Sequence, residues 1–287
     1  MPTETPEPGV YPDVDYDTYA SWDAINFHIL NYFRHSAAHA RYAMTAPEES
    51  KAHLAFGLAT HIAVLEPKRF DEEVLVVPKV DKRTKAGKAE WAAFEQRSQG
   101  RMLVKADEYD ALSAIKRNCL NHPTVTEILH SEGANEISLL WKDPELGVLC
   151  KGRLDRIAAL GGTQAIVVDL KTIGRPAASR TCERVSYDFG YHVQAAMYLH
   201  GLSVLRPVAE GGDAYEFFWI FAESAPPNLV RLFRADENVI ADGYAKYRDY
   251  LFAYSECKKH GKWPGWGEGV DELMLPAWAQ KVFDATN

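Results

Sequence analysis

The sequence predicts an α+β protein with mixed α/β character, in which helices flank a central mixed β-sheet. Two observations lead to this class: the first part of the chain has mainly helical periodicity, and alternating strands dominate from about residue 136 onward, interrupted by one helix. With 287 residues, of which 47% are hydrophobic, the chain is long enough for one elaborated domain. We expect this domain to span 18–275, between a flexible acidic tail at 1–17 and a C-terminal tail at 276–287.

Helices are predicted where apolar residues recur every three to four positions. They are expected at 21–33, 47–65, 106–119, 123–131, 187–201 and 244–254. The second of these has apolar residues at the i, i+4, i+8 and i+11 positions of one buried face: Leu54, Leu58, Ile62 and Leu65. The helices of the first part of the chain are expected to form an N-terminal elaboration of the sheet.

Strands are predicted where apolar and polar residues alternate, or where short apolar runs lie between turn residues. They are expected at 71–80, 136–141, 147–158, 164–172, 215–223 and 230–234. Gly161 and Gly162 provide a tight turn between the third and the fourth of these strands. The two strands are therefore expected to form an antiparallel hairpin.

Composition argues against several classes of protein. No apolar run reaches the roughly 18 residues of a membrane helix, and residues 1–17 lack the basic and apolar regions of a signal peptide. The cysteines are widely spaced and form no CxxC pair, so we expect reduced thiols, a cytoplasmic location and no membrane partner. The formal net charge of −8 argues against a surface coated in basic residues, although a local basic channel stays compatible with it.

One stretch departs from this acidic balance. Residues 79–101 contain seven basic and three acidic residues, together with Trp91 and Phe94. The stretch is either a solvated loop that leads into a helix or an arm that contacts phosphates. In the second interpretation its candidate DNA-binding residues are Lys82, Arg83, Lys85 and Lys88.

The predicted hairpin brings together the residues with the most informative chemistry. Because the turn is centred on Gly162, Asp155 and Asp169 face each other on neighbouring strands, with Cβ atoms roughly 5 Å apart. Lys171 follows Asp169 by two residues and therefore projects from the same face. Two carboxylates at that separation repel each other unless a cation lies between them, and hard oxygen ligands suit Mg²⁺ or Mn²⁺.

A surface ladder of ion pairs is the alternative interpretation of these three residues. Against it, Asp169 ends the apolar run 165–168, so its carboxylate is expected to be partly buried. A buried carboxylate needs a partner or a metal ion. We therefore favour a metal site, in which Lys171 orients a water molecule or helps to deprotonate it.

Further candidate residues lie on the neighbouring elements. Gln194 and Tyr198 are four residues apart and share one face of a predicted helix, a spacing that an ordinary polar helix edge also has. His61 lies one helical turn after Gly57, where it is either a ligand or a histidine of the core. Glu136, on the strand before the hairpin, offers a third carboxylate.

Five segments, taken in order along the chain, resemble motifs of the PD-(D/E)XK nuclease superfamily. Within it, they resemble the exodeoxyribonuclease VIII (RecE) type of nuclease domain of phage recombination systems. The segments are FGLATHIAVLEP, NEISLLW, GRLDRI, VVDLKT and YHVQAAMYL. Asp169-Leu170-Lys171 matches the D-x-K core of the superfamily, and Gln194-x-x-x-Tyr198 resembles the Q-x-x-x-Y motif of its RecB-like branch. The resemblance covers nearly the whole chain.

The resemblance implies a restriction-endonuclease-like core and a role for each matching residue. The ligands of a divalent metal ion would be His61, Asp155, Asp169, the main-chain carbonyl of Leu170 and, as an additional candidate, Glu136. Lys171 would position or activate the attacking water. Gln194 and Tyr198 would hold the DNA or the geometry of the active site.

The resemblance also implies a reaction, the hydrolysis of linear double-stranded DNA by an exonuclease that depends on Mg²⁺ or Mn²⁺ and serves phage-type recombination. An iron–sulfur cluster, which some RecB-like nucleases carry, is not expected, because only Cys257 follows the 187–201 helix. Two other functions stay open. One is a catalytically silent DNA-binding partner of a single-strand annealing protein, and the other is a structure-specific or single-strand endonuclease.

The contrast between an acidic chain and a DNA substrate predicts an oligomer. A closed ring, with a tetramer favoured, would turn the basic residues of 79–101 toward a central channel that holds DNA. Lys151, Arg153 and Arg175, near the hairpin, are expected to face the same channel. The resemblance points the same way, because RecE-type nucleases form toroids.

Overall fold

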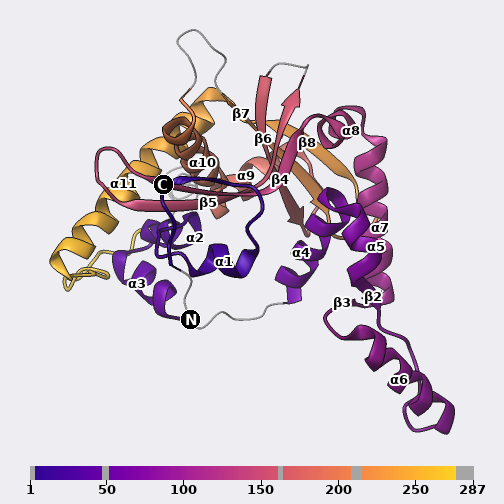
Figure 1. Cartoon of the computed structure of the whole chain (residues 1–287). Coiled ribbons are helices and arrows are strands. Elements are labelled where there is room, and N and C mark those ends of the chain that lie inside the picture. Colours follow the sequence, from indigo (N-terminus) through magenta and orange to yellow (C-terminus); the bar gives the residue numbers. More distant parts are fainter. Residues whose placement is uncertain (1–3, 47–51, 161–163, 208–214, 276–287) are drawn as a thin grey trace, which may run out of the picture.

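The computed structural model describes residues 4–46, 52–160, 164–207 and 215–275, and its centre is a mixed six-stranded sheet (Figure 1). The strand order is β1-β4-β5-β6-β7-β8, and among these strands the pair β6–β7 is parallel and the others antiparallel. The strands of this sheet are β1 (Gly9–Tyr11), β4 (Gly133–Lys142), β5 (Leu149–Leu160), β6 (Gln164–Ile173), β7 (Glu216–Glu223) and β8 (Val230–Arg234). Two further strands, β2 (Val74–Val76) and β3 (Met102–Val104), form a separate parallel pair. The predicted α+β class with a mixed sheet is confirmed.

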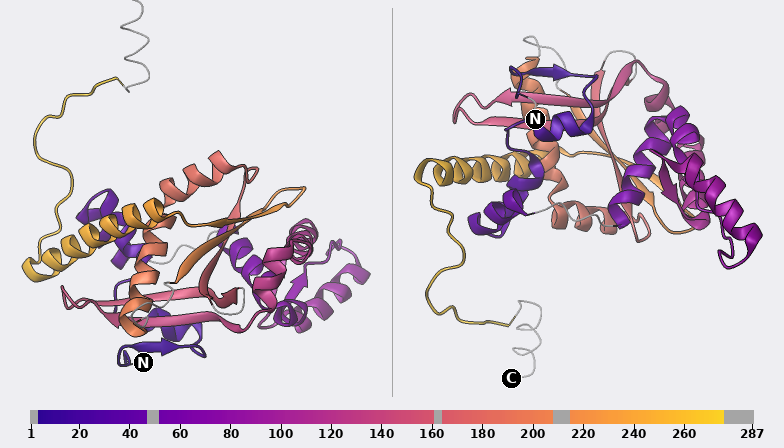
Figure 2. Two further views of the ribbon diagram at one scale, coloured as in Figure 1. Left: turned by 90° about the horizontal axis from the view of Figure 1, so that it is seen from above. Right: turned by 60° about the horizontal axis from the view of Figure 1, so that its bottom comes forward.

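Helices lie on both faces of this sheet, as the views in Figure 2 show. In chain order they are α1 (Tyr16–Ser21), α2 (Phe27–Leu30), the 3₁₀ turn η1 (Asn31–Arg34), α3 (Ala37–Thr45), α4 (Ala52–Leu65), α5 (Pro67–Glu73), α6 (Lys85–Ser98), α7 (Ala106–Asn121), α8 (Pro123–His130), α9 (Ser179–Phe189), α10 (Tyr191–Leu205) and α11 (Glu237–His260). Helices α2, α10 and α11 pack on one face, and α4, α7 and α8 pack on the other. In the described part of the chain, no helix is both long and apolar enough to cross a membrane.

Strand β6 is buried on both faces. Val167 packs in the core of the α10 side with Met197, whereas Val168 packs in the core of the α4 side with Ile128. Burial on both faces explains why this segment is a continuous apolar run instead of an alternating one. The same alternation puts Asp169 and Lys171 on the α10 face.

The N-terminal region differs from its prediction. Residues 9–11, expected to belong to a flexible tail, form strand β1 and pair with β4 at the edge of the sheet. Arg153 also donates a hydrogen bond to the carbonyl of Val14. The acidic composition of this segment hid its pairing, because an edge strand of three residues leaves little pattern in a sequence.

Two predicted elements are divided differently in the structure. The helix expected at 187–201 is two helices, α9 and α10, which meet at Gly190 in a left-handed conformation with φ 73°. Of the segment 71–80, expected to be a strand, the first residues belong to helix α5 and only β2 is a strand. In α4, Ile62 and Leu65 of the predicted buried face are buried, but Leu58 is 56% exposed, so its place in that face is wrong; Ala59 is buried instead. The side chain of Leu54, the predicted turn at Gly161-Gly162 and the tail at 276–287 lie outside the described residues.

Candidate metal centre and nucleic-acid interface

The candidate site lies where strand β5 separates from β6. The ladder between these strands ends at the pair Arg156–Val168, although β6 stays paired with β7 up to Ile173. The main-chain groups of Leu170 therefore lack a partner in β5. The carboxylate of Asp155 accepts a hydrogen bond from the Leu170 N–H at 2.7 Å, and Nε2 of a histidine on α4 lies 2.9 Å from the Leu170 carbonyl oxygen.

Strand β4 changes face at Glu136, which has φ 54°. Before it, Asn135 donates a hydrogen bond to a carbonyl of α4, and after it, Ile137 packs in the core of the α10 side. A glutamate in the left-handed region is uncommon, and such strain is found more often at functional sites. The register of the two strands places Glu136 opposite Asp155. The change of face thus brings a second carboxylate to the fork of the sheet.

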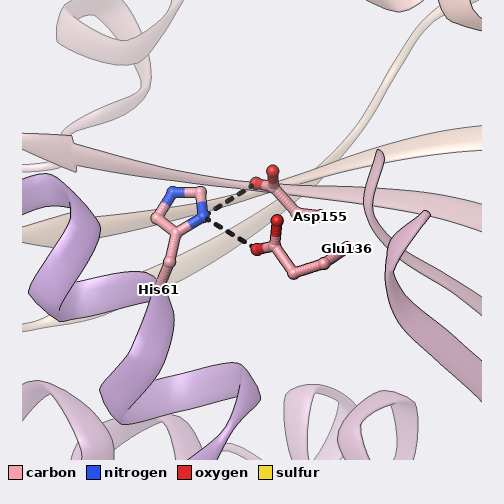
Figure 3. Close-up of side chains that lie close together, drawn as sticks. All are labelled: His61, Glu136 and Asp155. Carbon is pink, nitrogen blue, oxygen red and sulfur yellow. Dashed lines mark ion pairs between the residues drawn. The ribbon is translucent and has the colours of Figure 1, made fainter. Parts of the chain in front are cut away.

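These residues form a cluster with His61 (Figure 3). Nδ1 of His61 lies 3.6 Å from Oδ2 of Asp155 and 3.9 Å from Oε1 of Glu136. One ligand atom from each of the three residues lies within 4.8 Å of the others. An imidazole and two carboxylates are donors that Mg²⁺ and Mn²⁺ sites accept, with oxygen preferred by both ions. The residues present therefore fit a divalent metal ion.

The two carboxylates of the cluster favour a positive charge between them, as in a cation site. Burial opposes protonation of His61, but the carboxylates of Asp155 and Glu136 outweigh it and raise the pKa of His61 to about 9. Burial raises the pKa of Asp155 to about 7, against the effect of the nearby His61. Burial also opposes the charge of Glu136, yet contacts with His61 and Arg153 lower its pKa. Near neutral pH, protonated His61 thus supplies the positive charge that a metal ion would supply.

Asp169 and Lys171 form a buried ion pair beside this cluster. Nζ of Lys171 lies 2.7 Å from Oδ2 of Asp169, as their predicted position on one face requires. Burial opposes the charge of Lys171, but Asp169 and Asp155 raise its pKa above the ordinary value. Asp169 also contributes to the raised pKa of both Asp155 and His61, so it lies within electrostatic reach of the cluster. Among the described residues, the three-residue cluster does not include Asp169 itself.

The carbonyl of Leu170, expected as a ligand, makes a different contact in the structure. It accepts a hydrogen bond from Nε2 of His61, which leaves Nδ1 facing the two carboxylates. A carbonyl that accepts a hydrogen bond from one ring nitrogen of a histidine fixes the orientation of the ring. Leu170 is therefore a positioning partner of His61 here, and its role as a direct ligand stays a prediction.

Gln194 and Tyr198 lie on α10, which packs closely on the sheet. Nε2 of Gln194 donates a hydrogen bond to the Tyr198 hydroxyl at 3.2 Å, and both side chains are buried. A Cβ at Gly152 on β5 would come within 2.7 Å of the Tyr198 ring, so this position allows the helix to approach. Oε1 of Gln194 has no hydrogen-bond partner within the described part of the chain. The predicted pair is formed, and its role in holding DNA stays a prediction.

Two basic residues near the hairpin have structural contacts. Arg153, expected to bind DNA, forms an ion pair with Glu136 at 2.9 Å and donates to Ser138, and its side chain is only 16% exposed. Lys151 is buried and donates hydrogen bonds to three carbonyls at the C-terminal end of α1. These contacts argue against the expectation that the two residues face a DNA channel, since the hydrogen bonds of Lys151 and those of Nε and Nη1 of Arg153 are made within the protein; DNA binding by Arg153 stays a prediction. Arg175 is exposed.

The basic stretch 79–101 forms an arm around α6, which projects from the rest of the molecule (Figure 1). Lys85 and Lys88 are exposed, and Nζ of Lys82 lies 2.9 Å from the centroid of the Trp91 ring. Arg83 forms an ion pair with Asp81 at 2.9 Å, so part of its charge is compensated. The interpretation as a solvated loop leading into a helix agrees with this geometry, and the arm also remains a surface on which phosphates can lie.

Sequence reasoning missed one contact of the site. Tyr191, the first residue of α10, places its ring 4.7 Å from Nζ of Lys171. The single helix predicted at 187–201 would place Tyr187 and Tyr191 on one face, but Tyr187 lies on α9 and is 62% exposed. The glycine at 190, between two segments with helical periodicity, is the signal that could have indicated the break.

Comparison with known proteins agrees with the fold. A family described as "PDDEXK-like domain of unknown function" (DUF3799) matches residues 27–275. A crystal structure from Eubacterium rectale, described as that of a candidate exonuclease, has a TM-score of 0.57 and 11% sequence identity, covering 94% of this chain and 98% of its own. A structure described as SSO0001 has a TM-score of 0.29 and 14% identity and covers 78% of this chain and 84% of its own. No curated protein matches the chain.

Proposed function

Since the chain belongs to the family of PDDEXK-like domains, we propose that it is a divalent-metal-dependent nuclease that degrades linear double-stranded DNA from its ends. The observation that carries the proposal is the cluster of His61, Glu136 and Asp155 beside the ion pair of Asp169 and Lys171. Three carboxylates, one imidazole and one ammonium group at the fork of a sheet suit the hydrolysis of a phosphodiester. Mg²⁺ is the ion we propose, with Mn²⁺ as a substitute.

The residues divide into a metal-holding set and a charge-stabilising residue. His61, Glu136 and Asp155, joined by Asp169, would hold the ion. The ion when bound would supply positive charge to the phosphate oxygens and a water of lowered pKa. Lys171 keeps its proton, because its pKa is raised, so it orients water and stabilises negative charge instead of acting as a base. Gln194 keeps Tyr198 in place through its hydrogen bond to the hydroxyl.

DNA binding is proposed for the exposed basic residues. Lys82, Lys85, Lys88 and Arg175 offer charges that the described part of the chain does not bury. A ring of several copies, most simply a tetramer, would gather the α6 arms around DNA and would keep an acidic protein on its substrate. A place in phage-type recombination, beside a single-strand annealing protein, is the biological setting that we propose from the sequence resemblance.

A duplex labelled separately at its 5′ and 3′ ends tests this function. With Mg²⁺, we expect labelled mononucleotides to appear early from one end only, and we expect no degradation when the ion is chelated. Covalently closed circular duplex offers no end and should persist. Early cutting of closed circles would favour an endonuclease on the same fold, and binding of DNA without any cleavage would favour a silent binding partner.

A further inference from the structure

The corner between α9 and α10 carries an exposed aromatic ring that is connected to the catalytic lysine through a second ring. Phe189, the last residue of α9, is 55% exposed. Its ring stacks on the ring of Tyr191, with centroids 5.9 Å apart and planes inclined by 21°. The Tyr191 ring in turn lies 4.7 Å from Nζ of Lys171. A continuous path of contacts thus leads from an exposed aromatic face to the ammonium group of the site.

The main chain holds this corner in one conformation. Gly190 has φ 73°, and a Cβ at this position would also collide with the side chain of Asn31. Nδ2 of Asn31 donates a hydrogen bond to the Phe189 carbonyl at 3.0 Å, and Arg34 donates one to the Asp188 carbonyl. The main chain that carries Phe189 is therefore held in one conformation, and little backbone freedom is left to lose when a ligand binds.

An exposed ring on a fixed turn contributes little to folding, because its apolar surface stays in water. A flat partner would remove that surface from water without disturbing the turn. The carboxylate of Asp188 at this corner is paired with Arg184 at 3.3 Å, which weakens its repulsion of a phosphate. Since Lys171 faces the reacting phosphate in the proposed function, the flat group nearest to this corner is a base of the cleaved strand.

We propose that Phe189 and Tyr191 form a stacking platform for a nucleobase next to the scissile phosphate. The proposal rests on the nuclease function above and deepens it. We assign to Phe189 the face that the base turns toward its neighbour in the strand, so the base must unstack from its own strand and, in a duplex, leave its complement. The substrate class at the moment of cleavage is therefore a single-stranded or frayed terminus, even when the starting DNA is double-stranded.

A cycle of two protein forms and two substrates tests the platform. Wild type and Phe189→Ala are compared in Mg²⁺ on a single-stranded oligonucleotide and on the same oligonucleotide with an abasic residue at the terminal position. We expect Phe189→Ala to raise KM about tenfold on the intact strand, on the scale of one lost stacking contact, and to leave KM nearly unchanged on the abasic strand. Phe189→Tyr should behave as wild type, and Phe189→Leu, apolar but not aromatic, should resemble Phe189→Ala.

Phe252 on α11 is a matched control, since it is 57% exposed and belongs to another part of the molecule. Phe252→Ala should have no effect on either substrate. An equal loss on intact and abasic strands, or no loss on the intact strand, would overturn the platform while leaving the nuclease in place. If wild type degrades no DNA, the nuclease function fails, and the platform is tested separately: 2-aminopurine at the terminal position should lose fluorescence on binding wild type and keep it with Phe189→Ala.

Discussion

The carboxylate of Asp155 accepts a hydrogen bond from the main-chain N–H of Leu170 at 2.7 Å, at the point where β5 leaves β6. The same oxygen, Oδ2, lies 3.6 Å from Nδ1 of His61. Asp155 therefore has two functions in this structure. It satisfies a buried main-chain donor that the sheet leaves unpaired, and it offers an oxygen to a cation.

The two functions of Asp155 can be separated by two substitutions. Asp155→Ala leaves the buried N–H of Leu170 without an acceptor and should lower the free energy of unfolding by about 1–3 kcal/mol. Asp155→Asn keeps an acceptor oxygen and should cost less, while both variants lose affinity for Mn²⁺. Denaturant unfolding and calorimetric titration measure the two effects. Equal stability of the two variants would show that the hydrogen bond contributes little.

Lys171 is expected to matter for turnover and not for metal affinity. Lys171→Met removes the ammonium group but keeps a side chain of similar length, and it should lower kcat by at least about 10²-fold. Calorimetric titration with Mn²⁺ should give an affinity near that of wild type, because Lys171 is not a ligand. A loss of affinity as large as that of Asp155→Asn would contradict the role assigned to Lys171.

Metal affinity should rise with pH. His61, with a pKa of about 9, must lose its proton before Nδ1 can bind a metal ion, and Asp155, with a pKa of about 7, is partly protonated at neutral pH. The affinity for Mn²⁺ should therefore increase about tenfold per pH unit between pH 7 and 9, and more steeply below pH 7. Titration heats in two buffers of different ionisation enthalpy would report the released protons. An affinity independent of pH would exclude His61 as a ligand.

The α6 arm provides a prediction about DNA affinity. Lys88→Ala should weaken DNA binding, reduce the dependence of log affinity on log salt by about one unit, and leave stability unchanged. Lys258→Ala is the matched control, because Lys258 is exposed in the last turn of α11. Fluorescence anisotropy over a series of salt concentrations measures both. Equal effects of the two variants would exclude the arm as a specific DNA contact.

In contrast to Lys88, Arg153 is expected to affect the stability of the protein more than its affinity for DNA. Its guanidinium compensates Glu136 and ties β5 to Val14 and Ser138, so Arg153→Ala removes one of the two cations beside a partly buried carboxylate. We expect a loss of about 1–3 kcal/mol in the free energy of unfolding. A thermally stable Arg153→Ala variant that binds DNA weakly would restore the interpretation as a DNA contact.

The sheet and the D-x-K pair were predictable because their signals are local. Alternation over 164–172 placed Asp169 and Lys171 on one face, and the predicted hairpin register is the one observed between Arg156 and Val168. The chemistry of a carboxylate at the end of an apolar run also indicated a cation. These inferences need only the period of a strand and the position of a turn.

The remaining features of the site depend on long-range contacts. The left-handed conformation of Glu136 changes the face of β4, which no alternation pattern reveals. The partners of Lys151 and one partner of Arg153 lie in the N-terminal segment, more than a hundred residues away, so both residues looked like free charges in the sequence. The contact between Tyr191 and Lys171 follows from the break at Gly190.

The rate of nucleotide release from a linear duplex, measured for wild type and Asp155→Asn at saturating Mg²⁺, tests whether the cluster of His61, Glu136 and Asp155 catalyses DNA hydrolysis. Asp155→Asn keeps the hydrogen bond to Leu170, so it changes the charge of the site and not the fold. We expect Mg²⁺-dependent release by wild type and a rate lower by at least about 10²-fold for the variant. Equal rates, or release by wild type with the metal ion chelated, would show that the cluster at the fork of the sheet is not the catalytic site.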